Sequence, residues 1–492
     1  MTARRNPVGF SRLRRSSRGA SAPGGRGFVP GGLALALVFA SSSALAAQDW
    51  PQPRRDAQNL GSIELDAPKS PRPRPWSYDG SGRVWGYEPG MVVWTSAALG
   101  VVEGRAIVAV GSYDHLVYVL DAATGELVWK VATGGPLFGG PVLWNDVLFA
   151  AASDRLVYAF AAATGKSLWV HSVEEYRPTL GGARLSSPCV GQAGGRDAVF
   201  VGHWVWDRSL GHGLQRGGVS ALDAREGKPL WPRELGDNEI TAPIFARLPS
   251  GGRLFVGSSN GNLYCLDADS GSVLWQKTEL DAVRSPPALL PVSPPLVVTA
   301  SKFGMVRGLD AETGAERWSF KTGDRVTASP MAMPDGRVVV GSYDGRLYAL
   351  DGETGKLAWS YAARGGVYSS AAFVPASPAL VLASAWDHSL HAVAASDGAH
   401  RFTTYTGAPL WSVGGLDDSN WASPSAARIQ GTWMVFHGSY DGTLRALPLD
   451  ERDLRAPPIR SNLWFWLSFP IALVPVAAVA LLLTRHNRRR RG

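Results

Sequence analysis

The chain has little cysteine and little charge, and the usual catalytic motifs are missing. Cys189 and Cys265 are the only cysteines in 492 residues, too few for a disulfide framework. Both lie in apolar stretches, SSPCV and LYCLD, so we expect two small buried residues and no bridge between them. The sequence contains no C-x-x-C-H haem motif, no phosphate-binding loop and no recognisable Ser/His/Asp arrangement. These gaps give no support to haem, nucleotide or triad chemistry.

The excess of positive charge is confined to the two ends of the chain. The formal net charge is +8, and only 18% of the residues are charged. Residues 1–30 hold seven Arg and no acid, and residues 485–491 hold five more Arg. Removing these 12 charges from +8 leaves −4 for the part between them. That part is mildly acidic, so we predict no nucleic-acid partner.

Both ends carry membrane-related signals. Residues 1–47 combine an Arg-rich start, an apolar run and small residues, which is the layout of a secretory signal peptide. Residues 463–484 carry no charge and are long enough to cross a bilayer, and the Arg-rich tail 485–492 follows them. Positive charge stays in the cytoplasm, so we expect an exported protein anchored in the cytoplasmic membrane by one C-terminal span. A processed sorting tail remains the alternative to a permanent anchor.

Glycine and tryptophan are abundant instead, with 57 and 19 residues, and they recur in a repeated phrase. The phrase GSYDGRLYALDGETGKLAW at 341–359 has several near-copies, spaced mostly by 40 to 44 residues. An incomplete eighth copy lies at 438–449. The copies end on an aromatic residue, and these are Trp129, Trp169, Trp231, Trp275, Trp318, Trp359 and, in the seventh copy, Phe402.

Each copy divides into four short strands. In 327–361 the strands are TASPMAMP, RVVVGS, RLYALD and KLAWSY, with turn signals at Asp344-Gly345 and at Glu353-Thr354-Gly355. A four-stranded antiparallel unit of about 40 residues, repeated radially, is a β-propeller blade. The sequence therefore predicts an all-β, eight-bladed propeller over 73–449. An entry segment and linker (48–72) precede it, and a polar tether (450–462) leads to the span.

The terminal aromatic residue of each copy has a structural explanation. A large ring on the outer strand can cover the gap between adjacent sheets and bury about 200 Å². The eighth copy stops before its outer strand, whereas residues 74–78 (RPWSY) match the outer strands of other copies. We therefore predict that this N-terminal strand completes the last blade and that Trp76 is the eighth docking residue. Such closure removes the exposed edges of an open array.

On these residues the chain resembles the pyrroloquinoline-quinone-type repeat propellers, whose docking motif is A-x-D-x-x-T-G-x-x-x-W. The motif is read in Ala349–Trp359, Val119–Trp129 and Cys265–Trp275, among others. Catalytic members imply a quinone near the central axis, a Ca²⁺ held by carboxylate and amide oxygens, and an Asp base. This chain has no adjacent cysteines and no Glu/Asn/Asp set at recognisable positions. We predict no catalytic residue, no metal and no cofactor, with a PQQ/Ca-dependent dehydrogenase as the alternative.

Among non-catalytic members, the chain resembles the propeller component of the outer-membrane β-barrel assembly machine in repeat type and exported location. It departs from that protein in its anchor, so the same partner is not implied. The resemblance favours a monomeric propeller that serves as a binding or scaffold module, with other envelope proteins as partners. A ligand-sensing ectodomain is a further alternative, although the cytoplasmic tail is too short for a signalling domain.

Interruptions of the repeat mark the predicted site. The turns between second and third strands and the connections between blades open on one face, and both long departures, 203–218 and 406–421, fall there. Core packing is the alternative for the two tryptophans of the first loop. The histidines have no spacing diagnostic of a metal site. The predicted rim residues, including two from the AWDH turn, are His203, Trp204, Trp206, Asp207, His212, Arg216, Trp386, His388, Trp411, Asp417, Asp418 and Trp421.

Overall fold

The computed structural model describes residues 62–65, 85–87, 93, 95–173, 180–207, 215–236, 239–278, 280–387, 389–405, 422–438 and 444–449. All of them belong to one compact unit. The predicted signal peptide (1–47), tether (450–462), span (463–484) and tail (485–492) lie outside the described residues. Within the described ranges, no helix is long and apolar enough to cross a membrane.

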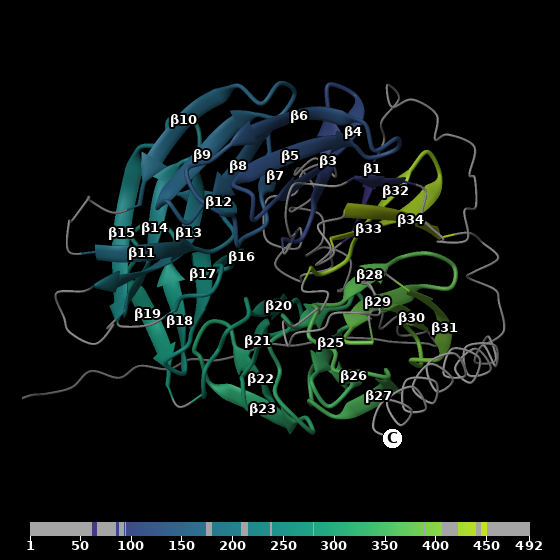
Figure 1. Cartoon of the computed structure of the whole chain (residues 1–492). Helices are drawn as coiled ribbons and strands as arrows, with labels where there is room; N and C mark the ends of the chain where they lie inside the picture. The colour runs from purple at the N-terminus through teal and green to yellow at the C-terminus, as the bar shows by residue number, and fades with distance from the viewer. Residues whose placement is uncertain are drawn as a thin grey trace, which may run out of the picture. The chain divides into compact units, whose positions relative to one another are not determined.

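Eight sheets are arranged around a common centre (Figure 1). The first three blades are β3 (Ala98–Val102), β4 (Arg105–Gly111), β5 (Leu116–Asp121) and β6 (Leu127–Ala132); β7 (Val142–Trp144), β8 (Val147–Ala151), β9 (Leu156–Ala161) and β10 (Ser167–Ser172); and β12 (Cys189–Ala193), β13 (Arg196–Asp207), β14 (Gln215–Asp223) and β15 (Pro229–Gly236), to which β11 (Leu180–Leu185) is added.

The next four blades are regular four-stranded sheets. They are β16 (Ile244–Leu248), β17 (Gly251–Ser258), β18 (Asn262–Asp267) and β19 (Val273–Lys277); β20 (Ala288–Leu290), β21 (Leu296–Ala300), β22 (Met305–Asp310) and β23 (Glu316–Lys321); β24 (Met331–Ala332), β25 (Arg337–Ser342), β26 (Arg346–Asp351) and β27 (Leu357–Ala362); and β28 (Ala372–Val374), β29 (Leu380–Ala385), β30 (Ser389–Ala394) and β31 (His400–Tyr405). The predicted eight-bladed, all-β architecture is confirmed.

The eighth blade combines the two ends of the described chain. It contains β32 (Ser425–Ile429), β33 (Thr432–Gly438) and β34 (Leu444–Leu449), with β2 (Trp85–Tyr87) on one edge and β1 (Ser62–Leu65) on the other. The predicted closure by an N-terminal strand is therefore present. The strand that pairs with β34 is 85–87, whereas the sequence predicted 74–78 for this place. In this pairing Trp85 stands opposite Ala446, as Trp359 stands opposite Ala349 in the sixth blade. Trp76 lies outside the described residues, and Trp85 has the register of the eighth docking position.

The first strand of each blade lies nearest the centre of the ring. First strands of neighbouring blades contact one another, as β3 does with β7 and with β32. The second and third strands are buried from both sides by adjacent sheets, and all six residues of both β29 and β30 are buried. Cys189 and Cys265 are buried and free on β12 and β18, as expected. The core is thus distributed between blades, and it depends on how well each blade adheres to the next.

The repeated tryptophan performs that adhesion through its ring and its nitrogen. The indole Nε1 of Trp318 donates to the backbone oxygen of Gly352 in the following blade at 2.7 Å, and Trp129, Trp169, Trp231, Trp275 and Trp359 do the same in theirs. The ring covers the turn glycine of the following blade: a Cβ on Gly355 would lie 2.7 Å from Trp318. In the phrase TG…W, the glycine therefore contacts the tryptophan ring of the preceding blade, and the tryptophan covers the turn glycine of the following blade.

Candidate binding rim

One face of the ring collects the turns between second and third strands and the connections between blades. The amide of Tyr343, in the β25–β26 turn, donates to the oxygen of Arg325 in the connection before β24 at 3.0 Å. Trp386, in the β29–β30 turn, donates in the same way to Gly366 at 3.0 Å. The same bond recurs at Ser153, Ser259 and Lys302. Each turn is therefore held beside the connection of its own blade. We call this face the rim.

The first predicted loop, 203–218, is mostly not a loop. It continues the ladder of β13 and β14, with His203 opposite Gly218, and β11 pairs along its other edge, with Leu185 opposite His203. Only residues 208–214, which include His212, lie outside the described part of this insertion. The interruption of the repeat is thus a sheet extension of the third blade.

Sheet formation removes two predicted rim residues from solvent. His203 is 5% exposed and Trp204 is 8% exposed. Burial lowers the pKa of His203 to about 4, so the imidazole is neutral at pH 7. Both residues pack inside the blade, which agrees with the core-packing alternative for Trp204.

The other predicted residues of this insertion lie on its strands. Trp206 and Asp207 stand opposite Gln215 and Leu180 in the ladders. Arg216 makes a 3.9 Å ion pair with Glu234 at the surface, a kind of contact that contributes little to stability. His388, Trp411, Asp417, Asp418 and Trp421 lie outside the described residues, so their place on the rim stays a prediction.

Trp386 is the predicted residue around which the structure builds a cluster. Its ring meets Tyr343 edge-on at 4.8 Å between centroids, and Tyr368 lies 5.9 Å away. The guanidinium of Arg325 stacks over Tyr343 at 4.2 Å, a cation–π contact. Tyr343 and Trp386 are half-buried and Arg325 is exposed. The indole Nε1 of Trp386 is buried and has no hydrogen-bond partner among the described residues.

A second, smaller group repeats this chemistry on the rim of the first blades. Tyr113, in the β4–β5 turn, meets Phe138 edge-on at 5.4 Å, and Arg184 stacks over Phe138 at 4.4 Å. Phe303, in the β21–β22 turn, is 61% exposed. The rim therefore offers aromatic faces and guanidinium groups from several blades. The sequence analysis singled out Trp386 but missed Tyr343, Tyr368 and Phe138. The aromatic residue before Asp in SYD was an available signal for Tyr343.

The turn carboxylates of the rim are already engaged. The hydroxyl of Tyr348 donates to Asp344 at 2.6 Å, and the amide of Arg346 donates to the same carboxylate at 3.0 Å. Burial, followed by the bond to Asp344, raises the pKa of Tyr348 to about 12. In the seventh blade His391 replaces the tyrosine and binds Asp387 at 2.9 Å. These carboxylates hold their turns together and leave few free oxygens for a cation.

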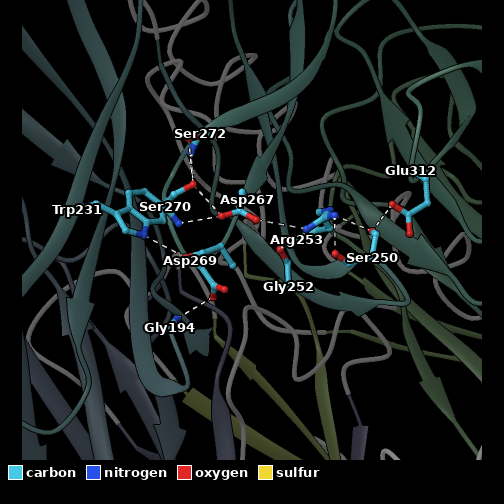
Figure 2. A network of polar contacts seen from close by, with 11 residues as sticks. Gly194, Trp231, Ser250, Gly252, Arg253, Asp267, Asp269, Ser270, Ser272 and Glu312 are labelled. Carbon is cyan, nitrogen blue, oxygen red and sulfur yellow. Dashed lines mark hydrogen bonds and ion pairs between the residues drawn. The ribbon is translucent and has the colours of Figure 1, made fainter.

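The opposite face is equally occupied by structural bonds, as Figure 2 shows for blades three to five. Arg253, 8% exposed, lies 3.5 Å from Asp267 and donates to Ser250 Oγ at 2.6 Å, and Ser250 donates to Glu312 of the next blade. Asp269 accepts the amide of Gly194 from the preceding blade at 2.7 Å. The network links three blades and presents no unused group of the kind found on the rim.

A quinone with Ca²⁺ does not fit the described residues. Such a centre needs several carboxylate or amide oxygens that converge near the axis. The described ranges contain no group of three or more His, Cys, Asp or Glu side chains that could hold a metal ion. In the eighth blade, β1 occupies the edge of β32 that faces the centre of the ring. We derive no chemistry through this cofactor.

Solved structures share the fold at low sequence identity. The quinohemoprotein alcohol dehydrogenase from Comamonas testosteroni matches with a TM-score of 0.62 and 17% identity, over 83% of this chain and 81% of that one. BamB from Moraxella catarrhalis matches with a TM-score of 0.51 and 16% identity, over 74% and 96%. The dehydrogenase and BamB thus match the chain to a similar extent, so the structural likeness shows the propeller fold alone.

Sequence comparison is more selective. The outer membrane protein assembly factor BamB of Xanthomonas campestris pv. campestris is 32% identical over 278 residues, which are 54% of this chain and 63% of the relative. That of Shewanella oneidensis is 26% identical over 256 residues, 50% and 59% of the two chains. A serine/threonine-protein kinase, AfsK of Streptomyces griseus, matches over 25% of this chain and 16% of its own length. The chain thus spans less than two thirds of each of these relatives.

The family comparison covers most of the propeller. The family model PQQ_2, described as outer membrane protein assembly factor BamB, matches residues 79–244, 215–297 and 302–464. These segments extend from β2 to β34 and leave out only residues 298–301, in and after β21; they include the docking tryptophans. Because they amount to more than half of the residues, the chain belongs to the PQQ-repeat family of outer membrane protein assembly factor BamB.

Proposed function

We propose that the chain is a non-catalytic binding module that holds another protein of the cell envelope against its rim. The cluster of Trp386, Tyr343, Tyr368 and Arg325 carries the proposal. Aromatic and arginine side chains are the residues that dominate protein–protein binding energy. Here they are gathered on one face, and the carboxylates beside them are used in the turns.

The relatives give the context of this proposal. Proteins named as outer membrane protein assembly factors are the curated sequences that match the largest shares of this chain among those compared above. We infer that the partner belongs to the assembly of envelope or outer-membrane proteins. We further propose that residues 1–47 direct export and that residues 463–484 anchor the propeller outside the cytoplasmic membrane, which would place the rim among such proteins.

A photo-reactive amino acid tests the rim directly. It is placed at Tyr343 or Phe303 in full-length protein in cells, and at exposed Leu168 on β10 as the matched control away from the rim. We expect a defined adduct with an envelope protein from the rim positions and none from Leu168. Arg325→Ala should reduce that adduct several-fold without changing the amount of folded protein. The proposal fails if the adducts from the rim and from Leu168 are the same, or if the rim positions give none.

A further inference from the structure

The strand β1 is an addition that the propeller does not need for closure. The ring closes through β2, which pairs antiparallel with β34 as the fourth strand of the last blade. β1 is a fifth strand on the other edge of that sheet, where it pairs with β32. Residues 66–84 separate β1 from β2 in the sequence, and the two strands lie on opposite edges of the sheet.

The direction of β1 sets it apart from the rest of the fold. It runs parallel to β32, with Ser62 opposite Ala426 and Leu65 opposite Ile429, whereas every other strand pair in the described part of the chain is antiparallel. Parallel pairing cannot come from a hairpin. β1 is thus held as a separate extended peptide would be held, by strand addition to an exposed sheet edge.

The receiving edge lies at the inner side of the ring and across the seam of closure. Besides β32, β1 contacts β3 of the first blade and β28 of the seventh (Figure 1). Ile63 is 2% exposed and Leu65 is 5% exposed. They join the cluster that contains Leu99 of β3 and Ile429 of β32. The inner edge of β32 therefore combines backbone pairing with apolar neighbours for two side chains separated by one residue.

We propose that the inner edge of β32 is a binding site for one extended peptide segment, and that residues 62–65 occupy it in cis. The ligand in trans is a strand-forming segment of another polypeptide that runs parallel to β32. It carries large apolar side chains at positions i and i+2. The register of the backbone pairing places the residue between the two apolar positions opposite Arg428. This site is separate from the rim and does not depend on the rim binding a partner.

A labelled peptide of residues 59–67 (NLGSIELDA) serves as the probe, and fluorescence anisotropy as the measurement. In the full chain, Ile63→Asp with Leu65→Asp weakens β1 and leaves β32 unchanged. We expect this variant to bind the probe at least 10-fold more tightly than the unaltered chain. The same peptide with both apolar residues changed to Asp is the control and should not bind. Equal, weak binding of the probe to both proteins overturns the proposal.

A second measurement leaves both β32 and β1 unaltered. A protease site is placed between residues 66 and 84, and the folded protein is cut so that β1 is joined to the propeller only through its non-covalent contacts. We expect the cut segment to exchange with excess labelled probe during gel filtration. A segment that stays bound for hours against excess probe shows a permanent structural strand and overturns the proposal. Formation of dimers by the cut protein would assign the inner edge of β32 to strand exchange between copies and would also overturn the proposal.

Discussion

Replacing the turn glycine of one blade by alanine gives a measure of how strongly two blades adhere. Gly355 has a φ of +69°, and a Cβ added there would lie 2.7 Å from Cδ2 of Trp318, the docking tryptophan of the preceding blade. Gly336, in the same blade, has a φ of +86° and nothing within 4 Å of an added Cβ. The ring of Trp318 covers Gly355, whereas no ring covers Gly336. Gly336→Ala is therefore the matched control for Gly355→Ala.

The expected costs follow from these geometries. In both variants alanine must adopt a left-handed backbone conformation, which lowers the free energy of unfolding by about 1–2 kcal/mol. In Gly355→Ala alone, the added methyl group is also forced into a packed contact, which lowers the free energy of unfolding by a further ~1–3 kcal/mol. We expect Gly355→Ala to lower the free energy of unfolding by roughly 2–5 kcal/mol, about twice the effect of Gly336→Ala. Urea denaturation followed by tryptophan fluorescence measures both, with an unchanged slope as the sign that only stability has moved.

A double variant identifies the contact that is responsible. Trp318→Phe removes the bond from the indole nitrogen to the Gly352 oxygen and shortens the ring that meets residue 355. If the methyl group of Gly355→Ala clashes with that ring, the two substitutions together should cost less than the sum of the single effects. Equal destabilisation by Gly355→Ala and Gly336→Ala, or strict additivity with Trp318→Phe, would refute the reasoning.

Two other predictions concern titration and closure. His203 is neutral in the fold with a pKa of about 4, whereas an unfolded imidazole has a pKa near 6.5, so only the unfolded state gains a proton as the pH falls through this window. The free energy of unfolding at pH 7 is unaffected, and it falls by about 3 kcal/mol between pH 6.5 and pH 4. His203→Phe should flatten this part of the pH–stability curve. An unchanged curve contradicts the assignment. Trp85→Ala should destabilise the ring by about 3 kcal/mol and Trp76→Ala by clearly less, since Trp85 holds the docking register opposite Ala446; the reverse order in a urea titration would restore Trp76 as the closing residue.

The number of blades could be predicted because each copy of the phrase is a complete local pattern. Its turn residues, strand alternation and terminal ring all lie within about 40 residues. The identity of the closing strand could not be predicted in this way. Both Trp76-Ser77-Tyr78 and Trp85-Gly86-Tyr87 have the pattern W-x-Y of an outer strand. The choice between them is made by pairing with Ala446, more than 350 residues away, and no local signal reports on that pairing.

The insertion at 203–218 differs from the predicted loop for a related reason. Its alternation of Trp204 and Trp206 is a strand signal, but the prediction followed the break in repeat spacing and expected a binding loop. The structure continues the β13–β14 ladder through it and buries His203 against β11. The parallel strand β1 was not predicted, because a strand of four residues carries no local sequence signal for the strand with which it pairs.

The rim turns separate the positions that build the propeller from those that are free to bind. In Ser342-Tyr343-Asp344-Gly345 the third residue caps the following strand and the fourth adopts a φ of +81°. The second residue contributes only its amide, which donates to the neighbouring connection. The same division holds where His115, with a φ of +71°, takes the glycine position, so this histidine serves the turn.

The second position of the turn can therefore vary without cost to the fold, and it is there that this chain places Tyr113, Tyr343 and Trp386. Architecture fixes the backbone of the rim, whereas the side chains at that position are not needed by it. A cation–π contact with Arg325 and a buried indole nitrogen without an acceptor in the described ranges add nothing that ring closure requires. The side chains that the repeat does not need are the ones from which a specific interface can be made, and this is why the rim and not the repeated phrase is the place to look for the partner.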